Sequence, residues 1–245
     1  DNQWKYISEE IKSLKKIFSK KTNIGKRRTD ITLLKEEVTY QNEYSLPNEP
    51  VSIILSEKGW VRCLKGKVED LKDLKFKDED SLFLSIDANS NDKMIFLSSN
   101  GKAYSLDAAD LPSGRGHGTP LKILLDIEEE HSIVNIFPFN SEKKYIVASS
   151  VGNGFVIKCH DMLSNRKSGK QIVNIKENQK LIICKKIKGE SVVAIGKNKK
   201  MLIFPIDELP ELSKGKGVRI QKYKDTELLF LDTFKYSDCL LYTSP

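Results

Sequence analysis

One pattern recurs along this chain and limits what it can fold into: two short apolar strands joined by a turn that contains glycine. It is clearest where the apolar run at residues 94–97 is followed by Ser98-Ser99-Asn100-Gly101 and a second strand at residues 102–106. The apolar run indicates a buried strand. The Asn-Gly pair predicts a type I′ hairpin turn, in which both central residues have a positive φ angle. We therefore expect an antiparallel hairpin here.

The same hairpin occurs four times. Gly59 lies 42 residues before Gly101, Gly152 lies 51 residues after it, and a fourth copy turns near Gly196 into a strand at residues 201–206. Repeats of this length with four short strands each are typical of propeller blades. A β-sandwich with coincidentally similar hairpins is the alternative. The loops after the hairpins are also similar, which favours an all-β, propeller-like fold of about four blades.

These loops combine glycine with basic side chains. They read Leu-Pro-Ser-Gly-Arg-Gly-His-Gly at residues 111–118, Ser-Asn-Arg-Lys-Ser-Gly-Lys at residues 164–170 and Leu-Pro-Glu-Leu-Ser-Lys-Gly-Lys-Gly at residues 209–217. Glycine allows a positive φ angle, so successive backbone N–H groups can face an anion. The loops are therefore candidate phosphate-binding elements.

The first and last of these loops, the hairpin at residues 149–156 and the segment at residues 49–62 resemble the C-terminal domain of the A subunit of bacterial DNA topoisomerase IV, a type IIA topoisomerase related to gyrase. The resemblance extends from residue 48 to about residue 224. It implies an incomplete β-pinwheel, a propeller variant whose blades exchange strands, and duplex DNA binding around the rim. The gyrase counterpart of this domain is the alternative within the family. Its first blade carries a Gln-Arg-Arg-Gly-Gly-Lys-Gly box, whereas the nearest loop here, residues 72–80, is partly acidic.

The two ends of the chain differ from the repeats. Ile7, Ile11, Leu14 and Phe18 recur at helical spacing and predict a short amphipathic helix. The Gly-Lys-Arg-Arg-Thr stretch at residues 25–29 is similar to the one that closes the helical tail of the breakage-reunion region in the same family. We expect residues 1–35 to be the helical end of that region, 36–49 a linker, and 50–237 the truncated pinwheel domain. Residues 238–245 resemble a translated sequencing adapter, so we expect a non-native tail and an open sheet edge near residues 228–234.

Positive charge is concentrated in one part of the chain. Residues 151–224 carry seventeen basic and six acidic side chains, a net charge of +11, whereas residues 51–150 have a net charge of −3. Clustered Lys and Arg side chains attract DNA phosphates and release condensed counterions, and such contacts position DNA without reading its bases. A propeller scaffold that binds protein and carries incidental surface lysines is the alternative. The predicted DNA-binding residues are Arg115, His117, Arg166, Lys167, Lys170, Lys197, Lys199, Lys200, Ser213, Lys214, Lys216 and Arg219.

No catalytic or metal-binding constellation is expected in this chain. The Glu-Glu-Glu-His run at residues 128–131 predicts a solvated bend, and the sequence contains no phosphate-binding loop for ATP. In the resembled family the strand-cleaving tyrosine lies in an upstream domain, and the ATP and Mg²⁺ of the holoenzyme are bound on other domains. The resemblance thus implies a part without catalytic residues or a cofactor of its own. It belongs to an ATP-hydrolysing type II topoisomerase and positions DNA for strand passage, decatenation and supercoil relaxation.

The implied partners are duplex DNA, the B subunit of topoisomerase IV, and a second A subunit. The four cysteines are scattered without a Cys-x-x-Cys pair, which is typical of a reducing compartment. No apolar stretch approaches the ~18 residues of a membrane span. We therefore expect a cytoplasmic, nucleoid-associated protein.

Overall fold

The computed structural model describes residues 2–26, 48–68, 70–114, 116–223 and 226–238. The chain divides into two compact units, residues 1–44 and residues 45–245, and each is described by itself. Arg115, almost all of the predicted linker and the predicted tail from residue 239 onward lie outside the described residues. No described helix is long and apolar enough to cross a membrane.

The first unit contains helix α1, Asn2–Ile17, which confirms the predicted N-terminal helix. Lys15 and Lys16 lie in its last turn, where positive charge interacts favourably with the helix dipole. The hydroxyl of Thr22 then donates to the carbonyl of Ile17 over 2.6 Å and accepts from the N–H of Gly25 over 3.1 Å. This side chain satisfies a carbonyl that the end of the helix leaves free.

The second unit consists of short strands joined by loops and single turns of helix. The strands are β1 Pro50–Ser56, β2 Trp60–Lys65, β3 Leu82–Asn89, β4 Lys93–Ser98, β5 Lys102–Asp107, β6 Thr119–Pro120, β7 Ile133–Pro138, β8 Lys144–Ser149, β9 Asn153–Lys158, β10 Lys170–Gln171, β11 Leu181–Lys186, β12 Ser191–Gly196, β13 Met201–Pro205, β14 Val218–Arg219 and β15 Leu228–Phe234. The helical turns are η1 Leu71–Asp73, η2 Ala108–Asp110, α2 Leu121–Leu124, η3 Cys159–Met162, η4 Ile206–Glu208 and η5 Tyr236–Asp238.

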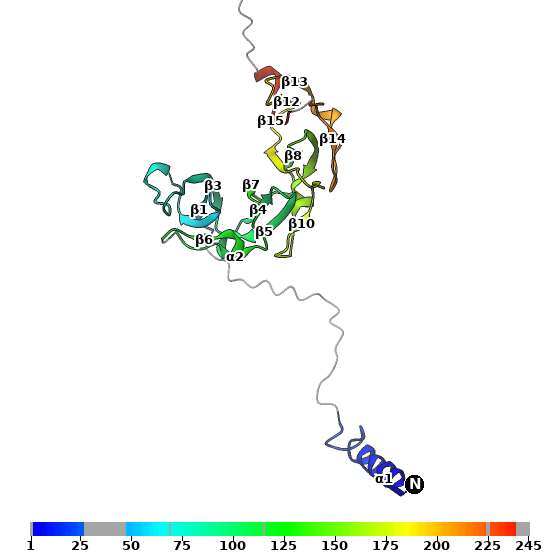
Figure 1. Ribbon diagram of the computed structural model, residues 1–245. Coiled ribbons are helices and arrows are strands. Elements are labelled where there is room, and N and C mark those ends of the chain that lie inside the picture. Colours follow the sequence, from blue (N-terminus) through cyan, green and yellow to red (C-terminus); the bar gives the residue numbers. More distant parts are fainter. Residues whose placement is uncertain (1, 27–47, 69, 115, 224–225, 239–245) are drawn as a thin grey trace, which may run out of the picture. The chain divides into compact units, whose positions relative to one another are not determined.

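The strands form antiparallel sheets that exchange strands along the chain (Figure 1). The sheet orders are β3-β1-β2-β6, β10-β5-β4-β7, β11-β8-β9-β14 and β13-β12-β15. Each of β6, β10 and β14 follows the hairpin of one repeat but pairs with the outer hairpin strand of the repeat before it, namely β2, β5 and β9. This exchange confirms the predicted all-β pinwheel.

The central strands of the second and third sheets, β4 and β8, are buried between neighbouring sheets. In β4, Phe96 packs in a cluster with Ile53 of the first sheet, and Ile95 on the opposite face packs with Val147 of the third sheet. All four side chains are at most 1% exposed. A strand that is covered on both faces needs apolar residues at successive positions, which explains the continuous apolar runs in the sequence.

The hairpin turns differ from the predicted type I′ geometry. Gly101 has a φ angle of 79°, but Asn100 is not among the residues with positive φ. The N–H of Gly101 donates to the carbonyl of Ser98 over 2.9 Å, and Asn100 Oδ1 accepts from the N–H of Lys102 over 3.1 Å. The type I′ prediction is wrong because the connection has three residues, and a type I turn followed by one left-handed glycine matches the twist of the strands.

The predicted open edge at residues 228–234 lies at an edge of the fourth sheet. Those residues form β15, which pairs with β12 and occupies the place that β3, β7 and β11 occupy in the other sheets. The exchanged strands β6, β10 and β14 lie at the other edge of their sheets, next to the second strand of each hairpin. The strand of the fourth sheet that lacks its outer neighbour is therefore β13.

Candidate nucleic-acid interface

The Leu-Pro loops are fixed along the outer strand of the preceding sheet. The carbonyl of Pro112 accepts from the N–H of Cys63 over 2.8 Å, and the carbonyl of Pro210 accepts from the N–H of Val156 over 3.0 Å. The N–H of Leu212 then donates back to the carbonyl of Val156 over 2.9 Å. Each loop is thus anchored at its start, and the residues after the anchor lie at the outer edge of a sheet.

A glycine stands directly before each exchanged strand. Gly118, Gly169 and Gly217 have φ angles of 90°, 72° and 74°. A Cβ atom on Gly217 would lie 2.3 Å from the carbonyl oxygen of Gly154. The conformational freedom that the sequence suggested for anion binding is therefore needed, at this position, for the close approach of the exchanged strand.

The loops of the third and fourth repeats meet at one cavity of about 440 Å³. Arg166 and Lys170 come from the third repeat and Lys214 from the fourth. The ammonium of Lys170 donates to the carbonyl of Asp161 over 2.6 Å. Among the described residues, no carboxylate forms an ion pair with any of these three cations. The cavity is lined by Leu163, Ser164, Asn165, Arg166, Gly169, Lys170, Gln171 and Lys214.

More predicted residues lie on the same two loops and on β14. Lys167 is exposed on the third-repeat loop, and Ser213 and Lys216 are exposed on the fourth-repeat loop. Arg219 is exposed on β14, opposite Asn153 of β9. We call Arg166, Lys167, Lys170, Ser213, Lys214, Lys216 and Arg219 the basic rim. Within the described residues its lysines and arginines have no acidic side-chain partner, so their charge is available to an outside anion.

Two lysines beside the fourth-repeat loop share one carboxylate. The carboxylate of Glu211 lies 2.5 Å from the ammonium of Lys144 and 3.0 Å from that of Lys158. These hydrogen bonds, Lys144 first, hold the pKa of Glu211 below its usual value. The three side chains join the fourth-repeat loop to the sheet on which it lies. Two lysines and one glutamate leave a net charge of +1, so Glu211 offsets half of the positive charge of this pair.

The structure places the remaining predicted lysines outside the glycine loops. Lys197, Lys199 and Lys200 lie in the turn between β12 and β13, and the ammonium of Lys197 is 2.6 Å from the carboxylate of Glu227. Lys199 has a φ angle of 63°. These three residues are exposed but do not line the cavity of the basic rim.

The loop of the second repeat is held by an arginine that was not among the predicted residues. Arg62 of β2 is only 6% exposed and donates to the carbonyl of Gly116 over 2.6 Å and to that of Lys75 over 2.9 Å. Its guanidinium also lies 5.4 Å from the centre of the Phe76 ring. His117, next to Gly116, is exposed. An arginine inside an otherwise apolar strand is the sequence signal that could have identified this contact.

Lysines of the first repeat are arranged differently from the basic rim. The ammonium of Lys65 lies 3.3 Å from the carboxylate of Glu49, and that of Lys67 lies 4.0 Å from that of Asp87. Both pairs are solvent-exposed, so they add little to stability, but they cancel charge locally. The first repeat therefore offers a matched control for the basic rim.

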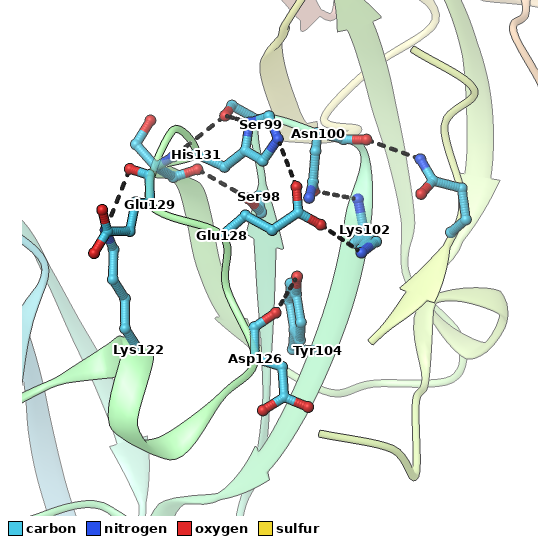
Figure 2. A network of polar contacts seen from close by, with 12 residues as sticks. Ser98, Ser99, Asn100, Lys102, Tyr104, Lys122, Asp126, Glu128, Glu129 and His131 are labelled. Atoms are coloured by element: carbon cyan, nitrogen blue, oxygen red, sulfur yellow. Dashed lines mark hydrogen bonds and ion pairs between the residues drawn. The ribbon is translucent and has the colours of Figure 1, made fainter. Parts of the chain in front are cut away.

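The acidic run at residues 128–131 forms a bend that is closed by internal contacts (Figure 2). Glu128 accepts from the ammonium of Lys102 over 3.2 Å and lies 3.3 Å from Nε2 of His131. The bond from Lys102 holds the pKa of Glu128 below its usual value. Ser99 and Ser132 exchange hydrogen bonds beside it, Ser99 N–H to the Ser132 carbonyl over 2.8 Å and Ser132 N–H to Ser99 Oγ over 3.2 Å. No metal-binding group of His, Cys, Asp or Glu occurs in the described part of the chain.

Fold and loops together define a class, a strand-exchanged β-propeller with a basic rim at the junction of two repeats. A family model described as "DNA gyrase C-terminal domain, beta-propeller" matches residues 92–140, 144–188 and 190–230. These segments make up more than half of the sequence. The chain therefore belongs to the family of DNA gyrase C-terminal domains, within which its relatives are A subunits of topoisomerase IV.

Two curated relatives are A subunits of DNA topoisomerase 4. The chain is 37% identical over 246 residues to the A subunit of DNA topoisomerase 4 from Rickettsia bellii, covering 98% of this chain and 33% of the relative. It is 42% identical over 183 residues to the corresponding protein of Caulobacter vibrioides, covering 75% of this chain and 24% of the relative. The chain thus spans a third or less of the length of these relatives.

Two solved structures share the fold. The Escherichia coli ParC C-terminal domain superposes with a TM-score of 0.71 at 32% identity, covering 76% of this chain and 80% of that one. A C-terminal domain of DNA topoisomerase IV superposes with a TM-score of 0.68 at 17% identity, covering 79% of this chain and 64% of that one. The second match supports the fold alone.

Proposed function

We propose that the chain binds duplex DNA through the basic rim. One observation carries the proposal: Arg166, Lys170 and Lys214, from two successive repeats, line one cavity without a carboxylate partner among the described residues. Uncompensated cations around a polar concavity favour an anion, and the exposed residues beside them extend the site along the rim. A polymer of phosphates fits such a row better than a single small anion does.

The contacts would be made to the DNA backbone. Lysine and arginine side chains neutralise phosphates, and Ser213 can donate a hydrogen bond to a phosphate oxygen. Because the loops are anchored to two adjacent sheets, the cations keep a fixed spacing. Affinity would then depend on DNA shape and salt, with little dependence on base sequence.

In its whole protein, this domain would serve topoisomerase IV. The relatives named above are parts of that enzyme, and we infer that this chain positions DNA segments for ATP-dependent strand passage, decatenation and relaxation. Cleavage and ATP hydrolysis would be carried by other domains and by the partner B subunit. We also propose that the whole protein is cytoplasmic and associated with the nucleoid. It would assemble with the B subunit and with a second A subunit.

Salt dependence tests the proposal. With a fluorescent duplex, the logarithm of the association constant is expected to fall linearly with the logarithm of salt concentration, with a slope of about −0.9 per phosphate contacted. Single-stranded DNA of equal length and a duplex of scrambled sequence serve as comparisons, and the scrambled duplex should bind equally well. No measurable duplex binding at low salt, or binding that is insensitive to salt, would favour a protein-binding scaffold instead.

A further inference from the structure

Arg62 occupies a place in the first repeat that the next two repeats give to a buried aromatic ring. In each outer hairpin strand, one residue pairs with the first residue of β6, β10 or β14, so the three strands can be aligned. The residue after it is Arg62 in β2, Tyr104 in β5 and Phe155 in β9. Both rings are 0% exposed. A cation that is 6% exposed thus stands where the fold otherwise places an uncharged ring.

The charge of Arg62 has no counter-charge among the described residues, in which it forms no ion pair. Its guanidinium donates to the carbonyls of Gly116 and Lys75 and lies over the ring of Phe76. These neutral groups satisfy its donors without neutralising it. Because a buried charge costs free energy unless it is compensated, an anion bound nearby would stabilise this arrangement.

The loop that carries Gly116 lies against β2. A Cβ atom on Gly114 would lie 2.1 Å from a methyl carbon of Leu64, and one on Gly118 would lie 2.3 Å from the carbonyl oxygen of Val61. Gly116 differs, because a Cβ atom there would meet nothing within 4 Å, although its φ angle is 75°. Glycine is therefore needed at position 116 for its left-handed backbone, and its carbonyl is the one that the guanidinium holds.

This contact also sets the direction of the next N–H group. In a trans peptide the C=O of one residue and the N–H of the next point in opposite directions, and no cis peptide bond occurs among the described residues. Since the Gly116 carbonyl faces Arg62 over 2.6 Å, the N–H of His117 points away from the guanidinium. No backbone carbonyl in the described part of the chain accepts from it. His117 is exposed, so this N–H is available to an outside acceptor.

The second loop held by Arg62 brings further positive charge. Nη1 of Arg62 binds the Gly116 carbonyl and Nη2 binds the Lys75 carbonyl, so the two loops meet at one guanidinium. Lys75 and Lys77 are exposed, and neither forms an ion pair within the described residues. The ammonium of Lys77 lies 5.0 Å from the centre of the Trp60 ring. Free cations thus lie on a loop that Arg62 joins to the N–H of position 117.

Two carboxylates of this first-repeat loop are engaged with other groups. Glu79 lies 3.8 Å from the ammonium of Lys58. Asp80 accepts from the N–H groups of Lys58 and Ser81 over 3.0 and 2.9 Å. These two side chains therefore compensate and order the turn at Lys58, and the lysines beside Arg62 keep their charge.

We propose that Arg62 is a positioning residue for a second contact with duplex DNA, made by Gly116 and His117 and flanked by Lys75 and Lys77. The inference rests on the proposed DNA binding and adds a contact outside the basic rim. The guanidinium turns the N–H of His117 toward a phosphate oxygen and places positive charge behind the peptide. The phosphate in turn compensates the buried charge of Arg62.

The test follows the backbone amide NMR signals of the full chain as duplex DNA is added. In the wild type the signal of His117 should shift saturably, as should those of Lys214 and Lys216 in the basic rim. In Arg62→Tyr the shift at His117 should fall at least fivefold, whereas the shifts at Lys214 and Lys216 should persist. Tyrosine is the matched substitution because Tyr104 fills the aligned place in the second repeat, so packing is kept while the charge is removed.

Arg62→Lys separates positioning from packing. It keeps the charge but not the two parallel donors, so its shift at His117 should lie between those of the wild type and Arg62→Tyr. A residue that only fills space would give no such order. If the tyrosine variant fails to fold, the lysine variant decides, and an undiminished shift at His117 would then overturn the proposal.

Other results would also overturn it. A folded Arg62→Tyr chain that keeps the full shift at His117 would show that the arginine does not position this N–H. Equal losses at His117 and Lys214 would show that the effect is not local. A wild-type chain that binds duplex with shifts at Lys214 but none at His117 would contradict this inference alone. A wild-type chain that binds no duplex would contradict the proposed function itself.

Discussion

Replacing Lys214, Lys216 and Arg219 with glutamate is expected to lower the affinity of the chain for duplex DNA by about a hundredfold or more. Each lost charge-assisted contact is worth roughly 1.5 kcal/mol, and repulsion adds to the loss. The log–log salt slope should become shallower by about 0.9 for each residue that contacts a phosphate. The measurement is duplex affinity across a salt titration, with thermal unfolding to confirm that stability changes by no more than about 0.5 kcal/mol.

The matched control is the same reversal at Lys65, Lys67 and Lys72 in the first repeat. Lys65 and Lys67 are already paired with Glu49 and Asp87, so their loss removes little free positive charge. Affinity should change by less than about threefold, because distant exposed charges are screened at physiological salt. If the control loses as much affinity as the rim variant, the DNA lies on another part of the domain.

The second large effect concerns folding. Gly217→Val is expected to destabilise the domain by about 2 to 4 kcal/mol, measured by urea denaturation. The φ angle of 74° is unfavourable for a β-branched residue, and the new Cβ would lie 2.3 Å from the Gly154 carbonyl oxygen. Relief requires the β14 strand to move away from β9, which would expose Ile220.

Gly215→Ala in the same loop is the control for this variant. Gly215 is not among the glycines with positive φ, and its added Cβ would come no closer than 3.2 Å, to the tip of the Leu212 side chain. A change within about 0.5 kcal/mol is expected. Equal destabilisation by both variants would show that the exchange geometry is not the reason for the glycine at position 217.

Local pattern predicted the hairpins but not their exchange. Apolar runs such as residues 94–97 and the turn glycines marked the central and outer strands of the first three repeats, because burial on two faces and a left-handed turn residue leave clear signals. The exchanged strands are two residues long, and Thr119–Pro120 or Lys170–Gln171 carry no apolar periodicity. Their pairing came only from the family resemblance. The edge predicted at residues 228–234 is an edge of the fourth sheet, but chain order alone did not show that β13 forms the other edge.

The candidate site was predicted in part. Glycine and basic residues together located the loops whose residues Arg166, Lys170 and Lys214 meet at one cavity. Counting charge over residues 151–224 overestimated the free positive surface, because Lys185 and Lys197 pair with Asp232 and Glu227, which lie outside the counted block. The role of each rim residue toward DNA stays a prediction.

Cross-linking tests the central claim most directly. A photo-reactive amino acid in place of Lys214 should form a covalent adduct with bound duplex DNA on irradiation, and the adduct should vanish at high salt. The same group in place of Lys65 should form none. An adduct from position 65 that equals or exceeds the one from position 214 would contradict the account and move the DNA to the first repeat.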